Sequence, residues 1–352
     1  MTTAWAAGPL FTTMLTGLLS NNKTSWGKIL QRALLAAARF LLLLLAVTAV
    51  AFLLVVHSPN DPVESFVGAG VSLEQQAVIE ENWGLNEPVW KRYVIWLEHV
   101  FHGDFGQSMA YRQPVATVLG SRVSLTLLLL CSAWLFSGVF GFLLGVISGV
   151  YRGSFADRLI RRFSLLMASA PVFWLGLLMI MLFAVRLRWF PMGLAAPAGK
   201  LAADVTIGDR IYHLILPAVT LGITGVSKMA LHTREKMIDI LDSEYMVFAR
   251  ARGEKLWTAI RRHGIRNILL PAVTIQFNSI NELFSGSVLA EQVFSYPGLG
   301  NAAAIAGLNG DANLLLAVTL VSAIIVFFGN LVAEILYGIL DPQIREGRQN
   351  ES

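Results

Sequence analysis

The chain has 352 residues, of which 55% are hydrophobic and only 14% charged, whereas about a quarter of an ordinary soluble domain is charged. Several apolar runs exceed the roughly 20 residues that a helix needs to cross a bilayer core. This composition excludes an ordinary soluble domain and predicts an all-α polytopic membrane protein. The net charge of +4 comes from basic residues that follow the membrane loops, so no nucleic-acid partner is expected. Cys131 is the single cysteine, which excludes an intramolecular disulfide and a thiolate metal cluster.

Six apolar segments are long enough to form transmembrane helices. Lys and Arg cluster before the first segment, between the second and third, between the fourth and fifth, and after the sixth. Because positive charge is retained on the cytoplasmic side, this distribution predicts that both termini are cytoplasmic. The predicted spans are residues 33–56, 124–150, 164–187, 213–230, 270–292 and 314–338.

The spans are expected to form one transmembrane domain, residues 33–340, because no repeat or low-complexity linker divides the chain. A cytoplasmic or interfacial segment, 1–32, should precede it, and a cytoplasmic tail, 341–352, should follow. The first residues, MTTAWAAGPLFTTML, lack the basic region of a signal peptide, so the first apolar helix is expected to remain as a span. The main external region, 57–123, is acidic and carries turn signals between expected short helices. A cytoplasmic loop, 231–269, joins the fourth and fifth spans.

Within that loop, the sequence EYMVFARARGEKLWTAIRRHGIRNILLP is charged although apolar spans flank it. Helical spacing places Tyr245, Phe248 and Ala249 on one stripe of a first short helix. Gly253 is expected to end this helix, as glycine does after a helix C-terminus. A second short helix is expected with apolar positions Leu256, Trp257, Ile260 and Ile268 and polar positions Arg261, Arg262 and Arg266.

Pro271 is expected in the first turn of the fifth span, where its missing N–H is tolerated. The two short helices before it allow two interpretations. They form either an amphipathic element on anionic lipid or a docking surface for a soluble partner. Two short helices broken by a glycine make a compact protrusion, which suits a cleft better than a flat bilayer.

Six segments of the chain, in order, carry a family resemblance. They are GLNEPVWKRYVIWLEHVFHGDFGQSM, PVFWLGLLMIMLF, HLILPAVTLGI, YMVFARARG, EQVFSYPGLG and ILDPQIR. Together they resemble the ABC-importer permeases of the dipeptide, oligopeptide and nickel family. The resemblance covers nearly the whole chain, and only residues 1–28 look like an extension.

The resemblance implies the type I permease fold of ABC importers and a location in the bacterial inner membrane. It implies as partners a second permease subunit, two ATPase subunits and an external substrate-binding protein. The general Glu-Ala-Ala coupling pattern of importers is degenerate here, because Val247, Phe248 and Ala249 occupy those positions. The peptide branch shares this departure through its Ala-Arg-Ala-x-Gly version. The ATPase-coupling residues implied are Glu244, Tyr245, Phe248, Ala249, Ala251, Gly253, Leu256 and Arg262.

An ATP site of its own is not expected in this chain. A P-loop requires G-x-x-x-x-G-K followed by Ser or Thr. The nearest segment, Gly193–Leu201, has one residue too many, ends in leucine and falls in an external loop. We therefore expect no cofactor on this chain and ATP with magnesium on partner ATPase subunits.

Polar residues in the fifth span point to the translocation path. Asn278, Glu282 and Ser285 share one face of a continuous helix, and Asn281 lies beside them. A charge at the bilayer centre costs about 2.5–3.5 kcal/mol on insertion scales, so this face is not expected to meet lipid. It lines a water-filled path or hydrogen-bonds to a neighbouring helix. With a carboxylate at this position, the transported solute can be either a peptide or a nickel-type metal chelate.

Other polar and turn residues have simpler interpretations. The loop after the fifth span, with Tyr296, Pro297, Gly298 and Gly300, is expected to be a rigid turn beside the gate. His99 and His102 share a helix face but have no third ligand nearby, so they are expected to be surface residues.

Two other function classes compete with the importer. An ion-driven transporter or channel would use Glu282 as its cation or proton site, but inverted repeats and broken helices are not evident. An intramembrane enzyme would need a nucleophile with a base or a set of metal ligands, and the sequence shows neither.

Overall fold

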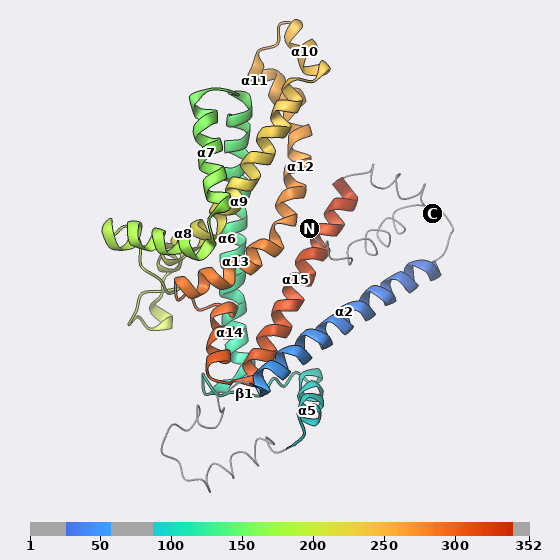
Figure 1. Cartoon of the computed structure of the whole chain (residues 1–352), viewed down its shortest axis with the longest axis vertical. Coiled ribbons are helices and arrows are strands. Elements are labelled where there is room, and N and C mark those ends of the chain that lie inside the picture. Colours follow the sequence, from blue (N-terminus) through green and yellow to red (C-terminus); the bar gives the residue numbers. More distant parts are fainter. Residues whose placement is uncertain (1–25, 58–86, 341–352) are drawn as a thin grey trace. The chain divides into compact units, whose positions relative to one another are not determined.

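The computed structural model describes residues 26–57 and 87–340. The expected segment 1–32, the acidic turn signals and the tail 341–352 lie largely or wholly outside these residues. Within the described residues, the regular elements are helices apart from one short hairpin (Figure 1). It divides into two compact units. Unit 1 is built around residues 128–296 and the chain from 328 onward, and unit 2 consists of residues 34–127 and 297–327.

Four helices in the described residues are long and apolar enough to cross a membrane. A fifth is added if the bent pair α7–α8 is counted as one span. The prediction of an all-α polytopic protein is therefore confirmed, whereas the number six is not reached by length and composition alone. The four helices are α2 (Trp26–Val56), α6 (Val115–Val150), α9 (Ile207–Leu241) and α15 (Ala312–Leu340).

The third predicted span is not one straight helix. α7 (Phe155–Ser169) and α8 (Val172–Met179) meet at an angle of 112°, and α8 continues as the π-helical segment η1 (Ile180–Arg186). The break lies at Ala170, which adopts an extended conformation before Pro171. Proline restricts the residue before it to such conformations, so the helix ends there.

The fifth predicted span is also broken. It consists of α12 (Ile265–Asn278) and α13 (Ile280–Val293), with Ser279 between them. Next to the break, the carbonyl oxygen of Gln276 accepts hydrogen bonds from the Trp134 indole (2.9 Å) and the Ser279 hydroxyl (2.7 Å). Side chains inserted in this way are a common cause of helix breaks.

Pro271 lies inside α12 rather than in the first turn of a span, contrary to the prediction. The helix already begins at Ile265, because the residues before the proline continue the helical path from the charged loop. The proline removes one backbone hydrogen bond without ending the helix.

Small residues bring α6 and α9 into close contact within unit 1. They recur at every fourth position of α6, at Ala133, Ser137, Gly141, Gly145 and Gly149. A Cβ atom on the last three would lie 2.6, 2.5 and 2.5 Å from the side chains of Met229, Thr233 and Met237 on α9. Such stripes let helix backbones approach closely where hydrophobic burial does not drive association.

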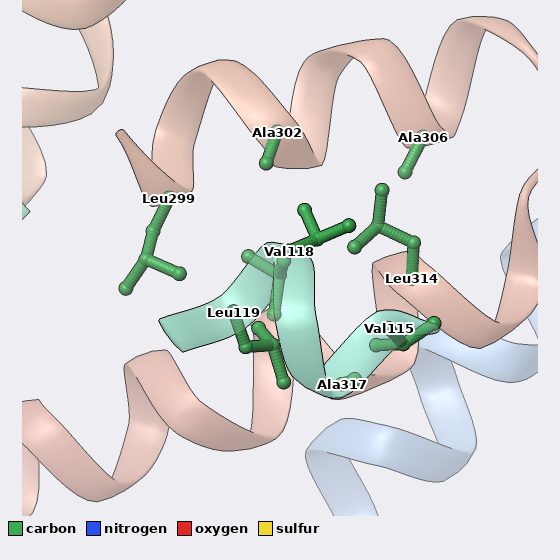
Figure 2. Close-up of a cluster of buried hydrophobic side chains, with 9 residues drawn as sticks. Val115, Val118, Leu119, Leu299, Ala302, Ala306, Leu314 and Ala317 are labelled. Atoms are coloured by element: carbon green, nitrogen blue, oxygen red, sulfur yellow. The ribbon is translucent and has the colours of Figure 1, made fainter. Parts of the chain in front are cut away.

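Unit 2 has its own apolar core (Figure 2). Val115, Val118 and Leu119 at the start of α6 pack against α14 (Leu299–Leu308) and the start of α15. The sequence interpretation had no helix at α14, which lies between the predicted spans 270–292 and 314–338. Likewise α6 begins at Val115, earlier than the predicted residue 124.

Unit 2 contains one of the short helices expected in the region 57–123, α5 (Val89–Phe101). After it, β1 (Gln107–Ser108) and β2 (Gln113–Pro114) form an antiparallel hairpin, with Ser108 opposite Gln113. The buried carboxylate of Asp311 accepts hydrogen bonds from the Ser108 hydroxyl (2.6 Å), the Ala110 N–H (3.0 Å) and the Leu314 N–H (3.0 Å). This one side chain therefore caps α15 and holds the hairpin against it.

Candidate functional site: a charged knob and a polar patch

The charged loop forms a compact knob at one end of unit 1 (Figure 1, top). It consists of α10 (Glu244–Ala251), α11 (Leu256–Ala259) and the π-helical segment η3 (Ile260–Gly264). Gly253 follows α10 with φ of +89°, a conformation that favours glycine. The predicted first helix and its end at Gly253 are thus confirmed.

One face of α10 anchors the knob. Met246 and Ala249 are buried and pack with Ala259, Ile260 and Ile268. Met237 and Ile240, at the end of α9, complete this cluster, and Leu256 packs against it. The knob is therefore a folded extension of α9 and α12 rather than a free loop.

The other face of α10 is open. Phe248 is 64% exposed and Tyr245 is also exposed, as is Trp257 on α11. The predicted stripe of Tyr245, Phe248 and Ala249 is therefore wrong as a single face: Ala249 faces the core, and the two aromatic residues face outward. The reason is that Met246, not Phe248, fills the space above Met237 and Ile260.

The second short helix continues directly into α12. α11, η3 and α12 follow one another without a break from Leu256 to Asn278. The basic side chains Arg261, Arg262 and Arg266 are exposed along it, as predicted. On its other side, α9 leads into α10 through Asp242 and Ser243 alone. Movement of the knob would therefore be passed directly to α9 and α12.

The turn between α6 and α7 lies at the same end of unit 1 as the knob. Arg152 in this turn forms an ion pair with Asp242 at 3.2 Å, and the Tyr151 and Trp257 rings have centroids 6.5 Å apart. The basic cluster after the second predicted span and the basic loop after the fourth thus lie together. The positive-inside rule requires these two basic segments to lie on the same side of the membrane, and their contact agrees with it.

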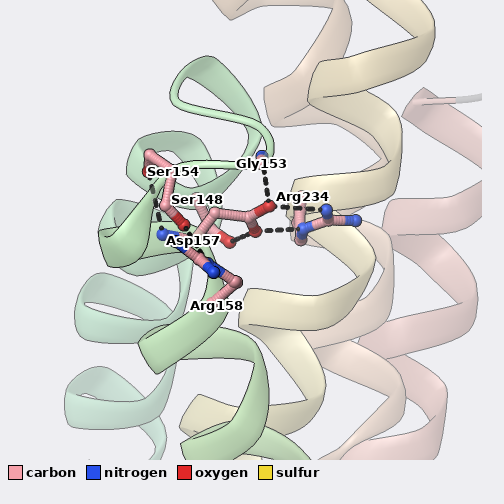
Figure 3. A network of polar contacts seen from close by, with 6 residues as sticks. All are labelled: Ser148, Gly153, Ser154, Asp157, Arg158 and Arg234. Atoms are coloured by element: carbon pink, nitrogen blue, oxygen red, sulfur yellow. Dashed lines mark hydrogen bonds and ion pairs between the residues drawn. The ribbon is translucent and has the colours of Figure 1, made fainter.

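A buried ion pair joins α7 to α9 near the knob (Figure 3). Arg234 donates two hydrogen bonds to the carboxylate of Asp157, from Nε at 2.6 Å and from Nη2 at 2.9 Å. The same carboxylate accepts from the Ser148 hydroxyl (2.6 Å) and the Gly153 N–H (2.8 Å). Sequence reasoning missed this network, because nothing local indicates which arginine pairs with Asp157.

A polar patch lies on α13, within the predicted fifth span. Asn278, Asn281, Glu282 and Ser285 are all exposed in the chain. The break at Ser279 places Asn278 on α12 and the others on α13, so the predicted face of one continuous helix is wrong. Asn281 donates a hydrogen bond to Asn330 of α15 at 2.6 Å, and the Ser285 hydroxyl donates to the Asn281 carbonyl at 3.0 Å.

Lys228 of α9 forms an ion pair with Glu282. The lysine side chain is 47% exposed and the glutamate 62%. The sequence interpretation did not use Lys228, although a lone lysine inside the apolar predicted span 213–230 was a visible signal. By contrast, Gln276 and Ser287, the other polar residues nearby, are buried.

The predicted turn beside the gate follows α13. Phe294 and Tyr296 are buried, Ser295 has a positive φ of 47°, and the Tyr296 N–H donates to the Glu291 carbonyl at 2.8 Å. Burial, with a contribution from Glu291, raises the pKa of Tyr296 to about 12. Pro297 and Gly298 complete the turn.

Gly300, in contrast, lies inside α14 and not in the turn, because the helix begins at Leu299. The N–H of Leu299 donates to the Thr126 hydroxyl at 2.8 Å, which starts the helix within unit 2.

Among the residues that the structure describes, no three His, Cys, Asp or Glu side chains are arranged to hold a metal ion. His99 and His102 lie exposed at the end of α5. The segment Gly193–Leu201 contains no helix start of the kind that follows a P-loop.

Comparison with known proteins agrees with the resemblance in the sequence. The family described as binding-protein-dependent transport system inner membrane component matches residues 141–346, and its N-terminal region matches residues 28–130. The oligopeptide transport system permease protein AppB of Bacillus subtilis is 36% identical over 303 residues, covering 86% of this chain and 95% of that protein. The glutathione transport system permease protein GsiC of Salmonella typhimurium is 33% identical over 303 residues, with coverages of 86% and 94%. A putative peptide permease protein of Brucella ovis is 32% identical over 307 residues, with coverages of 86% and 95%.

These matches exclude the ion-driven transporter and the intramembrane enzyme as alternatives. The chain belongs to the family of binding-protein-dependent transport system inner membrane components: it is a multi-pass permease subunit of an ABC importer, whose ATPase activity resides on partner subunits.

Proposed function

We propose that the chain crosses the inner membrane six times in a type I arrangement, with both termini in the cytoplasm. Four long helices and the bent pair α7–α8 supply five crossings. α12 and α13 together cover residues 265–293, enough for a sixth even though Ser279 interrupts them. The membrane domain is residues 33–340, with the external region 57–123 and the cytoplasmic loop 231–269 inside it.

The knob of residues 244–267 is the proposed contact for an ATPase subunit. The observation that carries this proposal is the division of α10 into two faces, one buried by Met246 and Ala249 and one exposing Tyr245 and Phe248. A folded protrusion with exposed aromatic residues suits a protein cleft, since aromatic residues are enriched at the centres of interfaces. Glu244, Ala251, Gly253 and Arg262, also implied by the resemblance, are exposed, whereas Ala249 faces the core and Leu256 packs against it.

ATP with magnesium is proposed to bind to two partner ATPase subunits and not to this chain. Their closure would move the knob, and α9 and α12 would carry that movement into the membrane. A second permease subunit is proposed to complete the path, and an external binding protein is proposed to deliver the solute.

Peptides are the proposed solute class, because the relatives named above are oligopeptide, glutathione and peptide permeases. The exposed polar patch of Asn278, Asn281, Glu282 and Ser285 is proposed to line the path. Lipid contact is unfavourable for such a face.

A pair of variants tests the coupling surface. Phe248→Asp should abolish co-purification of the ATPase subunits and ATP-driven peptide uptake while the chain still reaches the membrane. Phe155→Asp is the matched control, because Phe155 is also an exposed phenylalanine (75% against 64% for Phe248) and lies outside the knob, at the start of α7. Retention of the ATPase subunits by Phe248→Asp, with normal uptake, would refute the proposed contact.

A further inference from the structure

The ion pair between Lys228 and Glu282 has an unusual setting. Lys228 lies on α9 within the apolar predicted span 213–230, and Glu282 lies on α13 within the predicted span 270–292. Each side chain remains about half exposed. Charged residues in membrane segments normally face a protein interior or a water-filled cavity. The exposed sides of both charges must therefore meet water, a solute or another polar surface.

The pair is not needed to hold α9 against α13. Leu221 of α9 already packs onto Gly286 of α13, where an added Cβ would lie 2.9 Å from a leucine methyl group. Leu283 and Ala290 of α13 are buried as well. An ion pair as exposed as this one adds little to stability.

Neutral polar side chains lie next to Glu282 on α13. Asn281, next to Glu282 in the chain, is held by its hydrogen bond to Asn330 of α15. Ser285 lies one turn further along α13 and is exposed. Within unit 1 the patch therefore offers a positive group, a negative group, and amide and hydroxyl groups together.

We propose that Lys228 and Glu282 bind the two charged ends of a free peptide during transport. Lys228 pairs with the terminal carboxylate and Glu282 with the terminal ammonium group. This assignment rests on the proposed function as a peptide permease and identifies the zwitterionic backbone of the solute as the feature recognised.

The chemistry of the solute explains why both signs are present. A free peptide carries one positive and one negative end, and each end is costly to remove from water without an opposite charge. When the peptide binds, the contact between Lys228 and Glu282 is replaced by two contacts, one between Lys228 and the peptide carboxylate and one between Glu282 and the peptide ammonium group. The two side chains pair with each other again after the solute leaves, so neither charge stays unpaired.

The test uses the complete importer in proteoliposomes with its binding protein. Uptake is measured for a tripeptide with free ends, its N-acetyl form, its C-terminal amide and the doubly blocked form. For each solute the rate of a variant is divided by the wild-type rate, so the preference of the binding protein cancels.

We expect Glu282→Gln to lower uptake of the free peptide about tenfold, the loss expected for one hydrogen bond to a charged group. The N-acetyl peptide, which lacks the ammonium group, should be unaffected by this variant. Lys228→Met should show the opposite pattern, with about a tenfold loss for the free peptide and none for the amide. Lys236→Met is the control, because Lys236 forms an exposed ion pair with Asp239 on the same helix α9.

Equal losses for all four solutes would overturn the assignment and leave the pair as a structural contact. Loss of the second permease subunit from either purified variant would overturn it in favour of a subunit interface. If the wild-type importer carried neither free nor blocked peptides, the peptide solute itself would be wrong, and this assignment with it.

Discussion

Asp157 and Arg234, 77 residues apart in the chain, form a two-pronged ion pair that ties α7 to α9. The side chains are only 4% and 15% exposed. Arg234 lies among the α9 residues that meet the glycine stripe of α6, since an added Cβ on Gly149 would lie 2.5 Å from Met237 and 3.1 Å from the Arg234 carbonyl oxygen. The knob begins where α9 ends. The pair therefore stiffens the part of unit 1 through which movement of the knob would pass.

Replacing Asp157 with Asn should destabilise the protein by about 3 kcal/mol, because it leaves the guanidinium of Arg234 buried without its opposite charge. Thermal unfolding of the purified chain in detergent measures this. The double variant Asp157→Asn with Arg234→Met should cost less than the sum of the two single variants. Arg152→Met breaks an exposed pair nearby and should change stability little. Strict additivity in the double variant would contradict a direct interaction.

Gly145→Ala should separate α6 from α9. The new Cβ would lie 2.5 Å from the Thr233 side chain and 2.7 Å from the Ala230 carbonyl oxygen. Overpacking of this kind costs about 1–3 kcal/mol. Gly120→Ala in the same helix has nothing within 4 Å of its added Cβ, so it should leave stability unchanged or slightly raised. Similar melting temperatures for the two variants would show that the stripe does not set the helix separation.

The two faces of α10 should respond differently to truncation. Met246→Ala removes a fully buried side chain and should loosen the knob by about 2–5 kcal/mol. Phe248→Ala should leave the knob folded and weaken only ATPase attachment. Hydrogen exchange across residues 244–268 reports the first effect, and co-purification of ATPase subunits reports the second. Faster exchange in Phe248→Ala than in Met246→Ala would reverse the assignment of the faces.

The proposed orientation can be checked by thiol labelling. Cys131 is the single cysteine, so Cys131→Ser gives a background without thiols. In that background, Phe101→Cys at the exposed end of α5 should react with a membrane-impermeant maleimide added to intact cells. Phe248→Cys should react only after the membrane is permeabilised. Labelling of both positions in intact cells would contradict the cytoplasmic location of the knob.

Much of the architecture was predictable from local sequence. Hydropathy located the long helices, because a membrane span requires an apolar run in the sequence regardless of which helices pack against it. The helix over 244–251 and its end at Gly253 followed from residue types alone, since a glycine with positive φ ends a helix through its own backbone. The order of the family segments identified the permease before any packing was known.

Tertiary contacts decided the features on which the proposed mechanism depends. The break at Ser279 arises where Trp134, 142 residues away from Gln276, donates to a backbone carbonyl. Met246 rather than Phe248 became the buried residue of α10, because α9 and α12 supply the surface beneath it. The pairing of Lys228 with Glu282 likewise depends on which faces of α9 and α13 meet. Hydropathy and helix propensity are properties of neighbouring residues, so they determined the segments, whereas only packing between distant segments could select these partners.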